Sequence, residues 1–203
     1  MNCTKRLLAT VSLLAGLASA QAQSISIADF RTESDLPYMG TAGPLVYEQL
    51  GVAVGTGVEL GSSPIVSNPS EWGGGVVYLD LDPATNILTL TSQDAWNFQT
   101  FKATLTNISG ATVDGITLLT NNLTTANSDG SPVTPIVSFT GDSLTVLYDI
   151  ESAADPDSSF YFTGGTATFQ VAVSEVPEPA TYAMWLGGLT LVVAAVRRGR
   201  RTA

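Results

Sequence analysis

The chain has 203 residues, of which 44% are hydrophobic, so it is long and apolar enough to fold as one domain with a buried core and is not a disordered polymer. Residues 24–176 hold seventeen acidic and two basic residues, a net charge of −15, which argues against nucleic acid as a partner because such a surface repels phosphate. There is no histidine and the only cysteine is Cys3, which excludes a Ser-His-Asp triad and, once the N-terminus is removed, any disulfide or Cys/His zinc site.

The N-terminus has the features of a secretory signal peptide. Two basic residues precede an apolar run over residues 7–17, which is too short to cross the ~30 Å hydrocarbon core of a bilayer. Small residues follow, and both Ala20 and Ala22 complete a small-x-small cleavage pattern. We therefore predict a signal peptide over residues 1–22 that directs the chain to the Sec export machinery, in preference to an uncleaved anchor or a first core helix.

Residues 23–175 have the pattern of an all-β domain. Apolar residues recur at every second position, which places them on one face of a strand and leaves the other face to water. Short turn signals separate these runs and predict eight to ten strands, arranged as an antiparallel β-sandwich or a jelly-roll-like domain. A stretch at residues 45–54 fits helix or strand. The alternating residues are Val77, Leu79 and Leu81; Phe101, Ala103 and Leu105; Leu144, Val146, Tyr148 and Ile150; and Ala167, Phe169, Val171 and Val173. The turn signals include Asp82-Pro83, Ser109-Gly110, Asp114-Gly115 and Gly141-Asp142.

One acidic stretch, YLDLDPATNIL, is a candidate calcium site. Asp80, Asp82 and Asn86 bring oxygen ligands to nearby positions, and oxygen is the ligand that Ca²⁺ prefers. The same residues also suit the turn of a β-hairpin, where Asp and Asn form side-chain hydrogen bonds to the backbone. We expect no cofactor other than this possible calcium ion.

Two tryptophans are candidate platforms for carbohydrate. Trp72 in SEWGGG and Trp96 in DAWNF could each offer an aromatic face to a sugar ring, although an aromatic beside a strand is more often part of the core. Acidic residues are plentiful, but no spacing selects a carboxylate pair of the kind that hydrolyses glycosidic bonds. The sequence therefore predicts that the domain is not an enzyme.

The C-terminus combines an apolar run with a basic end. Residues 180–196 carry no charge, and their number is at the lower limit for a transmembrane helix. Arg197, Arg198, Arg200 and Arg201 follow this run and strongly disfavour crossing the membrane, so the predicted end stays cytoplasmic and the acidic domain lies outside. The alternatives are a permanent C-terminal anchor and a buried helix of the domain.

A short proline motif lies directly before the apolar run. Val176, Pro177, Glu178 and Pro179 form a stretch that two prolines keep extended, so it is accessible to a processing enzyme. The order of Pro-Glu-Pro, apolar helix and arginine cluster over residues 176–203 resembles the PEP-CTERM sorting signal of Gram-negative bacteria. The resemblance implies export, a transient stay in the inner membrane, cleavage near the motif by an exosortase, and delivery to the cell surface or the exopolysaccharide matrix.

Two functions are consistent with this pattern. The first is a structural or adhesive protein of the cell surface or extracellular matrix, with extracellular polysaccharide as its partner. The alternative is a carbohydrate-binding module with one defined glycan ligand, which calcium would assist. The sorting signal describes a route and leaves the activity of the β-domain open.

Overall fold

The structure, a computed structural model, describes residues 23–35, 44–63, 65–67, 76–95, 97–124, 133–149, 160–162, 164–175 and Gly188. The signal peptide, the sorting tail and both candidate tryptophans, Trp72 and Trp96, lie outside this part of the chain, so the hypotheses about them stay predictions. Within the described residues, no helix is both long and apolar enough to cross a membrane. The predicted membrane span, residues 180–196, falls outside the described part except for Gly188.

The described elements are all β-strands, as the alternating pattern predicts, and they form antiparallel sheets. Their number, twelve, exceeds the predicted eight to ten because three of them have only two or three residues. The ambiguous stretch after residue 44 is a strand. The elements are β1 (Ile27–Ser34), β2 (Leu45–Ala53), β3 (Ile65–Ser67), β4 (Val77–Asp82), β5 (Ile87–Ser92), β6 (Asn97–Phe98), β7 (Thr100–Ser109), β8 (Ala111–Asn121), β9 (Ile136–Thr140), β10 (Ser143–Asp149), β11 (Phe160–Tyr161) and β12 (Thr166–Glu175).

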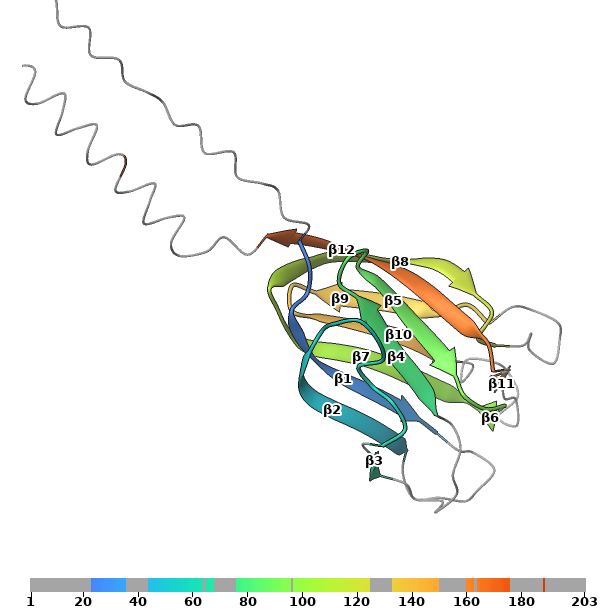
Figure 1. The fold of residues 1–203 in the computed structure, drawn as a ribbon. Coiled ribbons are helices and arrows are strands. Elements are labelled where there is room, and N and C mark those ends of the chain that lie inside the picture. The colour runs from blue at the N-terminus through green and yellow to red at the C-terminus, as the bar shows by residue number, and fades with distance from the viewer. Residues whose placement is uncertain are drawn as a thin grey trace, which may run out of the picture.

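Two large sheets make up the domain. One has six strands in the order β3-β2-β1-β7-β10-β9, the other has four in the order β4-β5-β12-β8, and β6 with β11 forms a small third sheet. Figure 1 shows the two large sheets as the two layers of a sandwich. Consecutive strands β1 and β2, β4 and β5, and β9 and β10 pair as hairpins within one sheet, whereas the chain changes sheet between β7 and β8. This architecture is the predicted sandwich.

A single hydrophobic core lies between the two sheets. Each predicted run buries its apolar face: Phe101, Ala103 and Leu105 on β7 and Ala167 and Phe169 on β12 are all fully buried. Side chains of both sheets belong to one cluster, since the inward faces of β1, β7 and β10 meet those of β4, β5, β8 and β12. Removing this apolar surface from water supplies the main force that holds the layers together. The predicted core is confirmed for the alternating residues that the structure describes, with Val173 only partly buried against it. Ile150 lies outside the described residues.

Four aromatic rings contact one another within this core. The ring centroids of Phe101 and Phe162 lie 4.9 Å apart in an edge-to-face arrangement, and those of Phe98 and Phe162 lie 4.8 Å apart. Tyr148 completes the group, with its centroid 6.3 Å from that of Phe101. Aromatic pairs at such distances contribute stability beyond their buried area. These rings connect β6, β7 and β10 to the segment around residue 162.

The turn predicted at Asp114-Gly115 is wrong. Both residues lie inside β8, where Gly115 is opposite Ala172 and Val113 is opposite Val173, so Asp114 is an extra residue in the ladder. The Asp-Gly pair therefore marks a β-bulge, which glycine also favours. The other signals named above are turns: Gly110 follows β7, and the Asp82-Pro83 and Gly141-Asp142 pairs connect hairpin strands.

Replacing Phe101 by alanine is expected to lower the free energy of unfolding by about 3–5 kcal/mol, because it removes a buried ring and leaves a cavity among three others. Urea unfolding of the purified exported protein, followed by intrinsic fluorescence, measures this loss. Leu119→Ala is the control, since Leu119 is 51% exposed and its truncation is expected to change stability by less than about 0.5 kcal/mol. Equal losses in both variants would contradict the core assignment.

Candidate functional site

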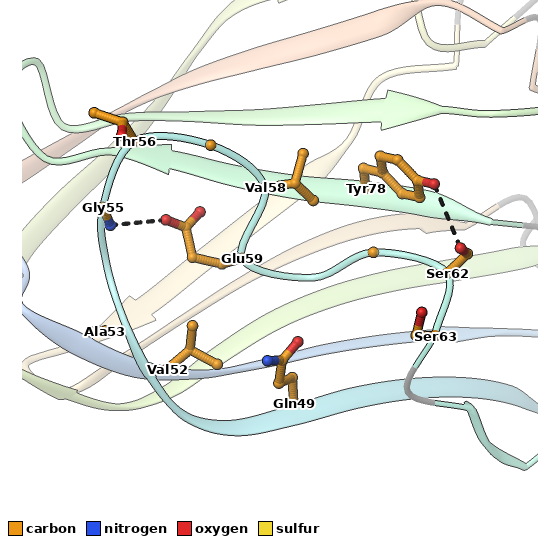
Figure 2. Close-up of a pocket in the computed structure, with 12 residues that line it drawn as sticks. Gln49, Val52, Ala53, Gly55, Thr56, Val58, Glu59, Ser62, Ser63 and Tyr78 are labelled. Carbon is orange, nitrogen blue, oxygen red and sulfur yellow. Dashed lines mark hydrogen bonds between the residues drawn. The ribbon is translucent and has the colours of Figure 1, made fainter.

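An open groove of about 470 Å³ lies between the end of β2 and the loop that follows it. Figure 2 shows this loop curving away from β2 and returning over β4. The groove has hydroxyl and amide groups on its sides and one aromatic ring at its edge. Its polar lining residues are Gln49, Thr56, Glu59, Ser62, Ser63 and Tyr78.

The loop after β2 connects the two layers of the sandwich. Glu59 and Leu60 both donate their backbone N–H to the carbonyl of Leu79 on β4, at 2.9 and 3.1 Å, and Leu79 donates back to Leu60 at 3.0 Å. Because β4 is an edge strand of the four-stranded sheet, the loop covers part of an edge that would otherwise be unpaired. Gly57 has a φ of +114°, which allows the sharp bend that this path needs. The wall of the groove is therefore fixed by main-chain bonds.

Glu59 is the buried acid of this loop, with 5% of its surface exposed. Its carboxylate accepts the backbone N–H of Leu81 at 2.8 Å and that of Gly55 at 3.0 Å, as Figure 2 shows for Gly55. Burial raises the pKa of the Glu59 carboxyl above its ordinary value, and these two hydrogen bonds oppose the rise. The Glu59 side chain therefore holds the loop in place, because both of its carboxylate oxygens accept backbone hydrogen bonds.

Replacing Glu59 by alanine is expected to lower the free energy of unfolding by about 1–3 kcal/mol, because the N–H of Leu81 loses its acceptor in a buried position. Folding raises the pKa of Glu59. The Glu59 carboxyl therefore makes its full contribution to the free energy of unfolding below pH 4.5, and this contribution is lost as pH rises through the folded pKa. The difference between wild type and variant should therefore shrink from pH 4 toward pH 8.

Urea unfolding at several pH values measures this difference. Thr56→Ala is the control, because Thr56 is exposed in the same loop and its truncation is expected to leave stability nearly unchanged. A difference between wild type and Glu59→Ala that grows with pH would contradict the assignment.

The aromatic ring at the edge of the groove belongs to Tyr78. It lies on the outward face of β4, between the buried Val77 and Leu79, and is half-buried. Its hydroxyl donates a long hydrogen bond of 3.5 Å to Ser62 Oγ at this edge of the groove. An aromatic face beside serine and threonine hydroxyls suits a ligand that is neutral and rich in hydroxyl groups.

The two basic residues of the domain lie elsewhere, on the outer face of the six-stranded sheet. Arg31 Nη1 lies 3.0 Å from Glu48 Oε1, and Lys102 Nζ lies 2.8 Å from Glu33 Oε2, each pair on neighbouring strands. The hydrogen bond from Lys102 is the main reason that the pKa of Glu33 is lowered. The lining of the groove thus has no cation to attract an anion, in a domain that is strongly acidic.

The candidate calcium residues lie at the β4–β5 hairpin. Asp80 and Asp82 share the outward face of β4, and Asp82 accepts hydrogen bonds from Ala84 N at 2.9 Å and Thr85 Oγ1 at 2.6 Å. These bonds lower the pKa of Asp82, and they are the turn bonds that the alternative interpretation expects. Asn86 has a φ of 54° and donates from its side chain to Gln23 O at 2.8 Å. Calcium binding here stays a prediction.

Sequence reasoning did not single out Tyr78 or Glu59. The alternation in VVYLDLD places Tyr78 on the outward face, and that signal was available in the sequence. The role of Glu59 depends on Leu81, twenty-two residues away, so no local pattern marks it. Among the described residues, no group of three or more His, Cys, Asp or Glu side chains is arranged to hold a metal ion.

Fold and groove together define an all-β sandwich domain with a polar groove at one sheet edge, whose lining includes no basic residue. Residues 175–201 match the family model described as the PEP-CTERM protein-sorting motif, which confirms the resemblance of the tail. This motif indicates an exported protein that an exosortase sorts. The match begins at Glu175, the last residue of β12. No curated protein and no solved structure matches the chain.

Proposed function

We propose that the β-sandwich acts without catalysis as a structural or adhesive protein of the cell surface or the exopolysaccharide matrix. The observation that carries this proposal is the sorting motif at residues 175–201, joined directly to a folded sandwich. The strong negative charge of the domain supports it further, because charge of one sign keeps an exported protein soluble. Hydrolysis of any member of a broad polysaccharide panel by the purified domain would contradict the proposal.

The route has three steps in this proposal. The Sec machinery exports the chain, the apolar run over residues 180–196 holds it in the inner membrane, and the exosortase then cuts near Pro177–Pro179. The arginines that follow the run keep the C-terminus in the cytoplasm until the cut. The released domain then reaches the surface or the matrix.

Replacing Pro177, Glu178 and Pro179 together by alanine is expected to leave the protein uncut and bound to the inner membrane, because the enzyme loses its recognition motif. Intact-mass measurement of membrane, surface and medium fractions from the native host detects this. Arg197→Lys is the control, since it keeps the charge that sets orientation and should be processed normally. Normal release of the triple-alanine variant would indicate another protease.

The groove favours a second candidate function, the binding of a neutral glycan. Tyr78 offers a half-buried ring, while Thr56, Ser62 and Ser63 offer hydroxyls at the same groove. The charge of the domain and the absence of a cation from the groove lining disfavour an anionic polysaccharide. In this proposal the sugar stacks mainly on Tyr78 in the groove, and not on Trp72 or Trp96, the stacking residues that the sequence predicts.

Replacing Tyr78 by alanine is expected to weaken glycan binding about tenfold or more, because stacking on an aromatic face is lost. Binding of wild type and variant to an array of neutral and anionic glycans, followed by titration of the best ligand, measures the loss. Tyr78→Phe keeps the ring and removes the hydroxyl, so it shows how much each of them contributes to binding. Trp72→Ala tests the sugar-stacking role that the sequence predicts for Trp72. Wild-type affinity in Tyr78→Ala would refute the groove as the site.

Calcium dependence is tested in the same assay. We propose Asp80, Asp82 and Asn86 as ligands of the calcium ion. Thr85 already donates a hydrogen bond to the carboxylate of Asp82, so calcium would compete with this bond. Calorimetric titration with CaCl₂ after treatment with a chelator measures binding directly. Absence of heat at millimolar calcium, a range typical of weak extracellular sites, would refute it.

A further inference from the structure

The start and the end of the sandwich lie at the same place. Ile27 at the beginning of β1 is paired with Ser109, and Glu175 at the end of β12 is paired with Ala111, two residues further along the chain. Figure 1 shows the blue beginning of β1 and the dark orange end of β12 close together. We call this region, made of Gln23–Ser26, Ser109–Ala111 and Ser174–Glu175, the shared end.

The N-terminal side of the shared end is held tightly. Ser26 donates from its backbone N–H to Ser109 O at 2.9 Å, and the side chain of Asn86 donates to Gln23 O at 2.8 Å. Gly110 has a φ of +89°, and a Cβ there would lie 2.5 Å from Ser26 Oγ, so only glycine fits. The chain is therefore fixed from Gln23 onward, directly after the predicted cleavage position Ala22.

The C-terminal side leaves little free chain before the sorting motif. Glu175 is still paired with β8, and Pro177 is only two residues further on. At about 3.8 Å between consecutive Cα atoms, Pro177 lies within about 8 Å of Glu175. An enzyme that cuts near Pro177–Pro179 therefore lies close to the surface of the folded domain. The residues directly before the motif, which such an enzyme would also bind, are paired in the sheet.

The last residues of β12 are also its least secured part. Pairing with β5 ends at Gln170, so residues 172–175 pair with β8 alone, next to the bulge at Asp114. Ala172 and Glu175 are exposed, and of these four residues only Val173 packs against the core. A segment with few buried contacts and one pairing partner opens locally at lower cost than the middle of the strand.

We propose that the shared end is the surface that meets the exosortase, and that residues 172–175 separate from β8 before the tail is cut. The inference rests on exosortase sorting. It adds that the enzyme acts on a partly opened strand of the folded sandwich. Cutting then depends on the population of the opened form.

A disulfide that locks β12 to β8 tests the opening step. Ser174 lies opposite Thr112, so Thr112→Cys with Ser174→Cys places two cysteines across the pair that must separate. The control is Thr120→Cys with Thr168→Cys on the same two strands, where the hydroxyl oxygens are 2.7 Å apart at the far end of β12. The only native cysteine is Cys3, in the predicted signal peptide, so no competing thiol remains after export.

The full-length variants are expressed in the native host, and tail removal is followed by pulse-chase and intact mass. The lock across Thr112 and Ser174 is expected to slow tail removal about tenfold or more, with recovery when the disulfide is reduced, while the control is cut at the wild-type rate. A flexible Gly-Ser spacer inserted after Glu175 is expected to speed cutting. Equal rates in the locked and control pairs, or equal slowing of both, would overturn the inference.

Failure of sorting itself gives a different result. If the exosortase does not use the motif, the triple-alanine variant of Pro177, Glu178 and Pro179 is cut as fast as wild type. If sorting holds and the strand need not open, the alanine variant stays uncut while the locked variant is cut normally. The two failures are therefore distinguishable.

Discussion

The packing of two sheets against one apolar core is the constraint on which the rest of this protein depends. Buried residues alternate with outward-facing ones along β4, β10 and the first part of β7 and β12, and these buried residues all lie in the same cluster. The rings of Phe98, Phe101, Tyr148 and Phe162 concentrate this packing at one place in the core. The inward-facing side chains are buried in this core, so contacts with ligands or partners are expected at sheet edges, loops and the ends of the domain.

The groove after β2 illustrates how an edge becomes a candidate site. The loop reaches β4 because Glu59, Leu60 and Leu79 exchange main-chain hydrogen bonds, and the buried carboxylate of Glu59 accepts the N–H of Leu81. The same contacts that cover a sheet edge thus hold polar side chains around Tyr78. Both basic residues of the domain are engaged in ion pairs on the outer face of the six-stranded sheet, so neither of them lines this groove.

The shared end connects the fold to the sorting route. A sandwich with its first and last strands beside the same turn, Ser109-Gly110-Ala111, presents both of its termini on one side. The sorting motif begins where β12 ends, so the processing enzyme meets folded domain rather than a long linker. Pairing at the end of β12 then becomes relevant to processing as well as to stability.

The sequence by itself determined the features that depend on neighbouring residues. Strand faces follow from period-two alternation, and the sorting motif follows from a short ordered string, so both were predicted and confirmed. The Asp114-Gly115 pair was misread because glycine favours turns and bulges alike, and only pairing with β12 decides between them. Tertiary structure alone placed Glu59 against Leu81, Tyr78 beside Ser62, and Ile27 near Glu175. These partners are far apart in sequence, and their contact depends on the order and register of strands, which long-range packing sets and no local pattern encodes.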